Sequence, residues 1–253
     1  MTGRRKRVFN YISYIAIGFM LINVIWYIAS ACLDMKALPS PIDVYAAYPS
    51  ALKNELLAHS LASLQRILVS IGISVFFALS LGLLMGYNRK ANRLLGPMLY
   101  FSYPIPKLAL LPIVMVLFDI GETSKIIIVV LIIVFQMIIT VRDAVRNISQ
   151  ENYHVLTSFG ATSVQKMRFI TLYAILPDIL SSLRVALGIV TSALFFIETF
   201  GTNYGLGYYI TDSLNKVDYI QMYLGILVLS IIGFLLFLVI DLIDSIACNW
   251  KNI

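Results

Sequence analysis

Few residues in this sequence have the types and spacing that catalysis requires. His59 and His154 are its only histidines, which excludes an H-E-x-x-H zinc motif and a histidine-rich metal site. The G-x-S-x-G elbow of the hydrolases does not occur, and neither does a Gly-Lys pair, which the phosphate-binding P-loop requires. The sequence therefore predicts a chain that is not an enzyme and holds no metal or cofactor, and any use of ATP would need a second, nucleotide-binding chain.

Two ionisable residues lie far apart in one apolar segment, where charge is costly and usually functional. Arg184 and Glu198 are separated by about 21 Å along a helix, so they do not pair with each other. Arg184 either finds a partner on another helix or reaches the inner membrane surface. Glu198 precedes the Gly- and Tyr-rich stretch TFGTNYGLGYYI, and it either braces this stretch or gates an exit beside it.

A third ionisable residue, Lys107, follows two closely spaced prolines in the segment YPIPKLALLP. Each proline removes a backbone donor and moves the preceding residue away from helical geometry. Freed carbonyls are tolerated in a membrane only against protein or a watery cavity, and many transporters pass substrate at such broken helices. A kinked packing helix is the alternative interpretation. The candidates for a translocation pathway are Pro104, Pro106, Lys107, Arg184 and Glu198.

Composition assigns the whole chain to the membrane. Its 253 residues are 60% hydrophobic and only 13% charged, with a mean hydropathy of +0.87. We predict an all-α polytopic membrane protein with a single transmembrane domain over residues 1–253. The fourth span is short, so Lys125 at its start is expected to snorkel to the surface. The six predicted spans cover residues 8–33, 63–87, 94–118, 123–145, 175–200 and 219–246.

The distribution of basic residues predicts the orientation of the chain. With six spans, one side receives most of the lysines and arginines, while Arg66, Lys107 and Arg184 lie within spans. This positive-inside pattern predicts a protein of the inner membrane with both termini in the cytoplasm. The same pattern explains the basic charge without nucleic acid as a partner. Cys32 and Cys248 then lie on opposite faces, which excludes a disulfide. A cleaved or lipidated signal peptide ending near Cys32 is a weaker alternative to an uncleaved first span.

Two further patterns concern helix packing. In the second span small residues recur every four positions and predict a strip for close helix contact, made of Ser70, Ser74, Ala78, Gly82 and Gly86. Outside the first span, residues 50–64 are expected to form a short amphipathic helix on the membrane surface.

The longest predicted cytoplasmic loop, residues 146–174, contains two short helix signals joined at a glycine. Gly160 is the usual residue just past a helix end, and Thr162 with Gln165 has the form of a capping box that starts the next helix. Apolar residues follow one face of both segments. The residues alone leave two interpretations open, a docking surface for a soluble partner and a helix pair lying on the membrane.

Several stretches resemble a known family. Gly160 followed by Ile170, Leu172 and Pro177 resembles the cytoplasmic "EAA" loop of ABC-importer permeases. The stretches PIPKLALLPIVMVLFDIGETSK and SLRVALG…FFIETFGTNYGLGYYI resemble the nitrate/sulfonate/taurine branch, and together the likeness covers roughly residues 60–210. The chain departs from the loop pattern where the Glu-Ala-Ala positions hold His154, Val155 and Leu156, and at Tyr173, where proline is common.

The resemblance implies a type I ABC importer-like fold and a permease subunit whose partners are ABC ATPase subunits, an extracytoplasmic solute-binding protein, a second permease copy in a homodimer, and membrane lipid. It also implies a small solute, of the nitrate, sulfonate or taurine kind or a vitamin precursor, and Lys107 with Arg184 would suit an anion. The alternative is a stand-alone secondary transporter or channel driven by an ion gradient. The residues implied to couple the permease to the ATPase are Phe159, Gly160, Ala161, Thr162, Ser163, Gln165 and Lys166.

Overall fold

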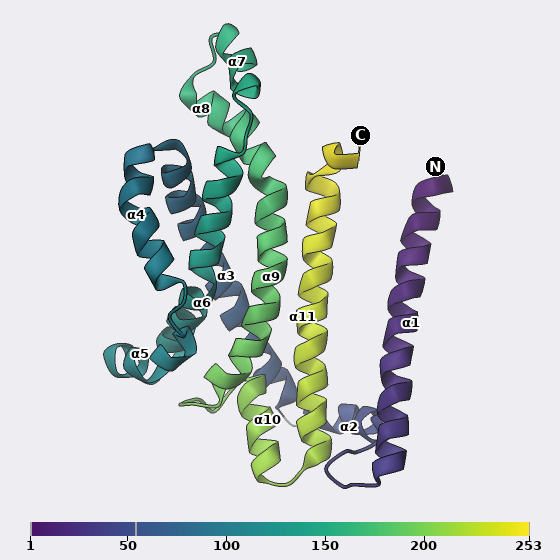
Figure 1. Cartoon of the computed structure of the whole chain (residues 1–253). Helices are drawn as coiled ribbons and strands as arrows, with labels where there is room; N and C mark the ends of the chain where they lie inside the picture. Colours follow the sequence, from purple (N-terminus) through teal and green to yellow (C-terminus); the bar gives the residue numbers. More distant parts are fainter. Residues whose placement is uncertain (1, 54, 253) are drawn as a thin grey trace. The chain divides into compact units, whose positions relative to one another are not determined.

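The computed structural model describes residues 2–53 and 55–252, and over these residues the secondary structure is helical with no strand (Figure 1). The chain divides into two compact units, one made of residues 1–57 and 209–227, the other of residues 58–208 and 228–253.

The first unit contains α1 (Thr2–Leu33), α2 (Pro41–Lys53), most of α10 (Leu206–Asn215) and the beginning of α11 (Tyr219–Ala247). The Trp26 ring stacks on Tyr223 with 5.4 Å between centroids, and the Tyr45 hydroxyl donates to Asn23 Oδ1 at 2.6 Å. The predicted surface helix over residues 50–64 is wrong, since α2 ends at Lys53 and the next helix begins at Leu56. A continuous helix there would have to pass through the joint between these two elements.

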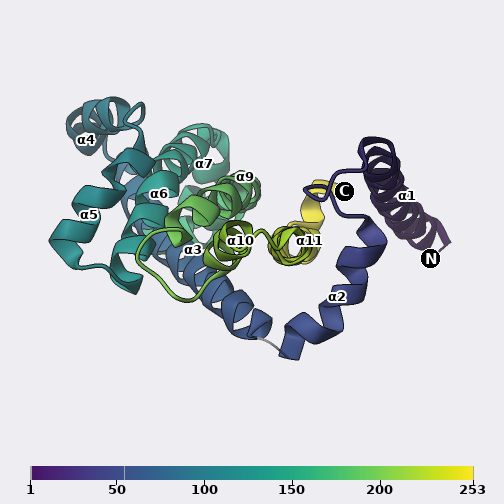
Figure 2. The same ribbon diagram turned by 90° about the horizontal axis from the view of Figure 1, so that it is seen from below.

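The second unit is built around three long helices, α3 (Leu56–Tyr87), α6 (Glu122–Arg146) and α9 (Leu172–Glu198), which lie side by side in both views (Figures 1 and 2). Their shared core is aliphatic, with residues such as Ile133 of α6 and Val190 of α9 completely shielded. Apolar residues inside a membrane gain no hydrophobic driving force from contacting one another, so tight packing of these surfaces holds the helices together.

The small-residue strip of α3 is confirmed, and its partner is α6. A Cβ added to Gly82 would lie 2.6 Å from Val141 Cβ, and one added to Gly86 would lie 2.7 Å from Val145 Cβ. The α3 and α6 backbones therefore approach more closely than any side chain at these positions would permit.

We expect Gly82→Leu to separate α3 from α6 and to lower the stability of the purified protein by about 1–3 kcal/mol, because Val141 and the Ile138 carbonyl leave no room for a side chain. Gly72→Leu is the matched control, since nothing lies within 4 Å of a Cβ at Gly72 on the same helix. Thermal unfolding in detergent micelles measures both variants, and equal melting temperatures would contradict the packing argument.

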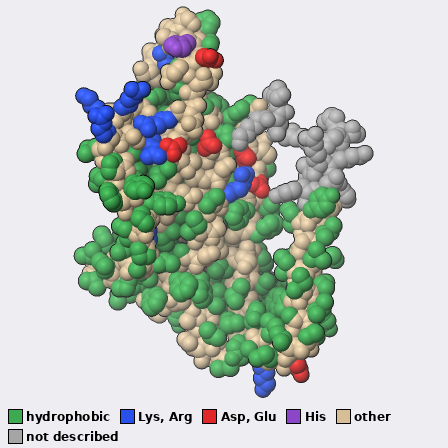
Figure 3. All heavy atoms as spheres, in the orientation of Figure 1, with side chains coloured by type: hydrophobic (Ala, Val, Ile, Leu, Met, Phe, Trp, Pro, Cys, Tyr) green, Lys and Arg blue, Asp and Glu red, His purple; other side chains and the backbone are tan. Residues whose placement is uncertain are grey.

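The third predicted span is broken. It consists of α4 (Arg89–Ser102), a short 3₁₀ turn η1 (Lys107–Leu110) and α5 (Leu111–Phe118), with a bend of 85° between the two halves. Pro104 and Pro106 occupy the non-helical joint, as their missing donors require. Large apolar side chains on both halves face outward, including Tyr100 and Val116, and Figure 3 shows hydrophobic side chains covering this region.

Five helical segments are long and apolar enough to cross a membrane, and six if the bent pair counts as one span. The fifth predicted span begins earlier than residue 175, because the short helix α8 (Ser163–Lys166) continues through a π-turn, η2 (Met167–Thr171), into α9. The loop after α6 is correspondingly shorter than 146–174. The five segments are Ser13–Leu33, Leu56–Tyr87, Glu122–Arg146, Ser163–Glu198 and Tyr219–Ala247.

Candidate functional site

A sharp corner joins α7 (Gln150–Ser158) to α8, and together they project beyond the ends of α6 and α9 (Figure 1). Gly160 turns the chain with a φ of +71°, a left-handed conformation that side chains other than glycine and asparagine rarely adopt. The Gly160 amide donates to the Thr157 carbonyl at 2.9 Å, and the Ala161 amide donates to the Leu156 carbonyl at 3.0 Å. The last carbonyls of α7 are thus satisfied within the corner itself.

The predicted capping box is confirmed on the other side of the corner. The Gln165 amide donates to Thr162 Oγ1 at 3.3 Å, and the Thr162 amide donates to Gln165 Oε1 at 2.7 Å. Because both bonds close within four residues, the start of α8 is fixed without help from the rest of the protein. We call residues 155–166 the corner from here on.

The corner presents apolar side chains outward from a polar, projecting segment. Phe159 is 83% exposed, and Val155 and Val164 are also exposed. Ser163 and Gln165 are exposed beside them, and Lys166 is half-buried. Exposed apolar side chains surrounded by polar ones are typical of a protein-docking surface.

Three hydroxyl groups anchor the base of the corner, a contact that the sequence did not reveal. The buried Thr171 hydroxyl, in the π-turn, contacts the Tyr87 hydroxyl at the end of α3 and lies 2.9 Å from the Tyr153 hydroxyl of α7. These contacts join α3, α7 and the helix leading into α9 at one point, so that a force on α7 reaches the long helices directly.

At the opposite end of α9, Glu198 lies in a buried ion cluster, which we define as Ser63, Arg66, Glu122 and Glu198. Arg66 Nη1 donates to Glu198 Oε1 at 2.6 Å, and its Nε donates to Glu122 Oε2 at 2.6 Å. Ser63 Oγ donates to the Glu198 carboxylate at 2.8 Å. Arg66 and Glu198 are both inaccessible to solvent, whereas the Glu122 side chain is 60% exposed. One arginine therefore connects α3, α6 and α9.

The buried ion cluster also holds the glycine-rich stretch that follows Glu198. The Gly207 amide donates to Glu198 Oε2 at 2.8 Å, and the Leu206 amide donates to Ser63 Oγ at 2.8 Å. Gly205, with a φ of +136°, lies so close that a Cβ would be 2.5 Å from both Arg66 Nη1 and Glu198 Cδ. This arrangement favours the bracing role for Glu198 over an exit gate, because every contact of the carboxylate is internal.

The expectation that Lys125 snorkels is wrong. Its side chain is buried in the protein, and Nζ donates to the Gly201 carbonyl at 3.0 Å. Gly201 has a φ of +59°, which turns the chain so that its carbonyl reaches α6. Lys125 is thus a second tie between α6 and the glycine-rich stretch.

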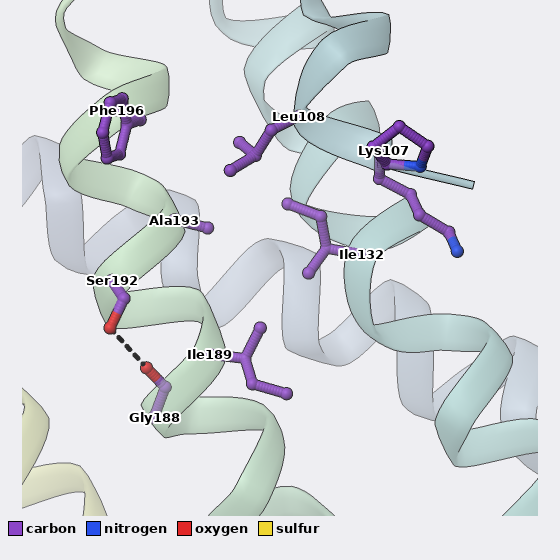
Figure 4. Close-up of a pocket in the computed structure, with 9 residues that line it drawn as sticks. Lys107, Leu108, Ile132, Gly188, Ile189, Ser192, Ala193 and Phe196 are labelled. Carbon is purple, nitrogen blue, oxygen red and sulfur yellow. Dashed lines mark hydrogen bonds between the residues drawn. The ribbon is translucent and has the colours of Figure 1, made fainter. Parts of the chain in front are cut away.

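The broken segment borders an apolar hollow of about 610 Å³ between η1, α6 and α9 (Figure 4). Its walls are mostly aliphatic, with Phe196 on one side and Ser192, whose hydroxyl donates to the Gly188 carbonyl at 3.1 Å. Pro106 and Lys107 lie at its edge, but the Lys107 ammonium points away from the hollow and donates to the Ser102 carbonyl at 2.6 Å and the Tyr103 carbonyl at 2.5 Å. Lys107 therefore caps the end of α4.

The five pathway candidates occupy separate places. Pro104 borders a different hollow, of about 430 Å³, beside Gln136. Arg184 connects α9 to α11, since its Nε donates to Asp241 Oδ1 at 2.6 Å and its Nη2 donates to Asp244 Oδ2 at 3.2 Å. Pro106 and Lys107 border the same apolar hollow. Among residues 2–53 and 55–252, no three His, Cys, Asp or Glu side chains are grouped closely enough to hold a metal ion.

The fold and these sites define a class of membrane protein. The chain belongs to the family described as binding-protein-dependent transport system inner membrane components, whose model matches residues 74–247. A chain in the inward-facing crystal structure of the MetNI methionine ABC transporter superimposes with a TM-score of 0.62 at 18% identity, over 78% of this chain and 98% of that one. The fold is therefore that of a type I ABC importer permease.

Individual relatives place the chain in the predicted branch. The taurine transport system permease protein TauC of Escherichia coli (strain K12) is 32% identical over 224 residues, which cover 86% of this chain and 82% of that protein. The formylaminopyrimidine transport permease protein ThiX of Halalkalibacterium halodurans is 27% identical over 92% of this chain and 94% of that protein. The resemblance to ABC-importer permeases of the nitrate/sulfonate/taurine branch is confirmed.

Proposed function

We propose that this chain is the permease subunit of an ATP-driven importer and forms the translocation pathway for a small solute. The observation that carries the proposal is the corner, which combines a left-handed Gly160, a closed capping box and the outward-facing Phe159. A rigid segment with an apolar tip is better suited to docking into a groove of an ATPase subunit than to remaining exposed to water.

The helix that starts in the corner supplies the mechanical connection. From Ser163 to Glu198 the chain is helical over 36 residues, roughly 50 Å at about 1.5 Å per residue, and it ends in the buried ion cluster. A displacement of the corner by the ATPase would therefore move the glycine-rich stretch at the other end. The ATPase shifts the equilibrium between two permease states only through contacts that differ between them, and a rigid corner transmits such a difference.

The proposed assembly follows from the orientation of the chain in the membrane. The corner and both termini face the cytoplasm, as the distribution of basic residues predicts. Two ATPase subunits bind the corners of two permease copies, and a solute-binding protein delivers the solute on the other side. The family description, which names binding-protein-dependent transport, supports the solute-binding protein as one of these partners.

For the solute we propose a small polar molecule or anion of the kinds carried by the relatives, which are named for taurine, formylaminopyrimidine, aliphatic sulfonates and bicarbonate. Lys107 is the charged residue that borders the apolar hollow, and its ammonium caps α4 instead of pointing into the hollow. Arg184 lies elsewhere and is neutralised by two aspartates. Selection by charge within the permease would then be weak, and the binding protein would choose the solute.

Two substitutions at Gly160 test the docking role. Gly160→Val should abolish uptake, because a β-branched residue at this φ costs about 1–2 kcal/mol and would be relieved by opening the corner. Gly160→Asn is the matched control, since asparagine tolerates the left-handed region and nothing lies within 4 Å of a Cβ there. Uptake and ATP hydrolysis are measured in proteoliposomes with the chains that co-purify in mild detergent.

We expect the valine variant to fold and insert normally while hydrolysis no longer drives uptake, and the asparagine variant to behave like the parent protein. Normal uptake by the valine variant would contradict the docking role. Uptake by the chain alone, with no ATPase present, would instead support a secondary transporter.

A further inference from the structure

A second hollow, distinct from the apolar one, opens where α3 and α6 end and α4 and α7 begin. It has a volume of about 540 Å³ and lies beside the hydroxyl anchor at the base of the corner. Its walls are largely polar, unlike those of the apolar hollow. They are formed by Gly86, Tyr87, Arg89, Val145, Arg146, Gln150 and Tyr153.

Positive charge in this hollow is not balanced by the protein. Arg89 and Arg146 are exposed, and over the described residues no carboxylate lies within 4.0 Å of either guanidinium. Arg142, one turn earlier on α6, is by contrast paired with Asp143 at 2.7 Å. Figure 3 shows further basic side chains gathered over the beginning of α4, where Lys90 and Arg93 are exposed. The hollow is therefore suited to an anion.

The hydroxyl anchor supplies an additional donor. Both tyrosines line the hollow, and their hydroxyl groups meet at the Thr171 hydroxyl. A hydroxyl group rotates about its C–O bond and can donate to a ligand in the hollow. A ligand with several acceptor oxygens would satisfy this donor and both guanidinium groups together.

The position of the hollow indicates where such a ligand comes from. Tyr87 and Arg146 are the last residues of two membrane-spanning helices, so the hollow lies at the depth of lipid headgroups. Guanidinium groups bind phosphate oxygens in pairs, and basic pockets between helices at the cytoplasmic surface are typical sites for anionic headgroups. We propose that this hollow binds the phosphate of an anionic phospholipid of the inner leaflet and thereby fixes the joint between α6 and α7.

The assignment to the inner leaflet rests on the proposed orientation, but recognition of the phosphate does not. Binding of phosphatidylglycerol to the purified full-length chain is measured by native mass spectrometry and by thermal unfolding in a neutral detergent, with phosphatidylcholine as the zwitterionic reference. Neither measurement depends on ATPase or uptake, so the outcome is separate from that of the proposed function.

The test variant is Arg89→Gln/Arg146→Gln, and the matched control is Lys90→Gln/Arg93→Gln, which removes the same charge from the same surface outside the hollow. We expect phosphatidylglycerol to bind and stabilise the parent and the control, and binding by the test variant to fall about fivefold for each arginine removed. Arg89→Lys/Arg146→Lys should retain part of the affinity, because lysine keeps the charge without the paired geometry.

Equal loss in the test and control variants would overturn the proposal, since the charge of the whole surface would then account for binding. In a second adverse outcome, inorganic phosphate at millimolar concentration stabilises the parent protein as well as phosphatidylglycerol does. That result would assign the hollow to a soluble phosphate and overturn the proposed lipid site. All variants change exposed side chains, and their unfolding in the absence of lipid verifies that they are folded.

Discussion

Replacing Glu198 with glutamine is expected to destabilise the protein by about 3–5 kcal/mol, the usual cost of leaving a buried charge without its partner. The carboxylate accepts hydrogen bonds from Ser63, Arg66 and the Gly207 amide. A glutamine side chain offers one acceptor oxygen, and its NH₂ group would point at one of these donors. As a charged partner Arg66 would keep Glu122, whose side chain is 60% exposed. Chemical unfolding in mixed micelles measures the loss.

A double variant distinguishes the effect of losing the ion pair from the effect of changing the two side chains individually. In Arg66→Met/Glu198→Gln no buried arginine is left without compensation, so the double variant should be less destabilised than the sum of the two single variants. Additivity within about 0.5 kcal/mol would show that the pair is not coupled. If Glu198 instead gated an exit, its substitution would change uptake and leave unfolding unchanged.

Gly205→Ala should be nearly as damaging, by about 3–5 kcal/mol, for two independent reasons. A φ of +136° is strained for any residue with a side chain, and the new Cβ would lie 2.5 Å from Arg66 Nη1 and from Glu198 Cδ. Neither group can withdraw without breaking the buried ion cluster. We expect the variant to unfold at a markedly lower denaturant concentration and to lose uptake in proteoliposomes.

Gly72→Ala is the matched control for this prediction. Gly72 lies within α3, where nothing is within 4 Å of a Cβ, and alanine is the better helix former by about 1 kcal/mol. Its stability should equal or slightly exceed that of the parent. A Gly205→Ala variant as stable as this control would show that the glycine-rich stretch is not held against Arg66.

The features that sequence reasoning predicted are those set by neighbours in the chain or by the membrane. Apolar runs identified the spans, since lipid requires them, and the break after Tyr103 followed from two prolines. The capping box of Thr162 and Gln165 was predicted because both partners lie within four residues. The continuation of the helix that begins at Ser163 into the predicted span over residues 175–200 was not predicted, because Lys166 and Arg168 interrupt the apolar pattern there.

The features that were missed depend on residues far apart in the sequence. Arg66 and Glu198 are 132 positions apart, and only the packing of α3 against α9 brings them together. Lys125 was expected at the membrane surface because its span is short. The Gly201 carbonyl that binds its ammonium could not be foreseen, since it is 76 positions away in the sequence. The available signal was a charged residue in each of several apolar segments, which required partners without identifying them.

The break in the third predicted span, between α4 and α5, has a consequence for biogenesis. A break in a helix inside a bilayer leaves backbone carbonyls without hydrogen-bond donors, which is energetically unfavourable in lipid. Such a subunit ordinarily depends on contacts with neighbouring subunits to satisfy these carbonyls. Here the Lys107 ammonium covers the Ser102 and Tyr103 carbonyls from within the same polypeptide. We therefore expect a newly synthesised copy to tolerate this break in the bilayer before it meets its partner subunits.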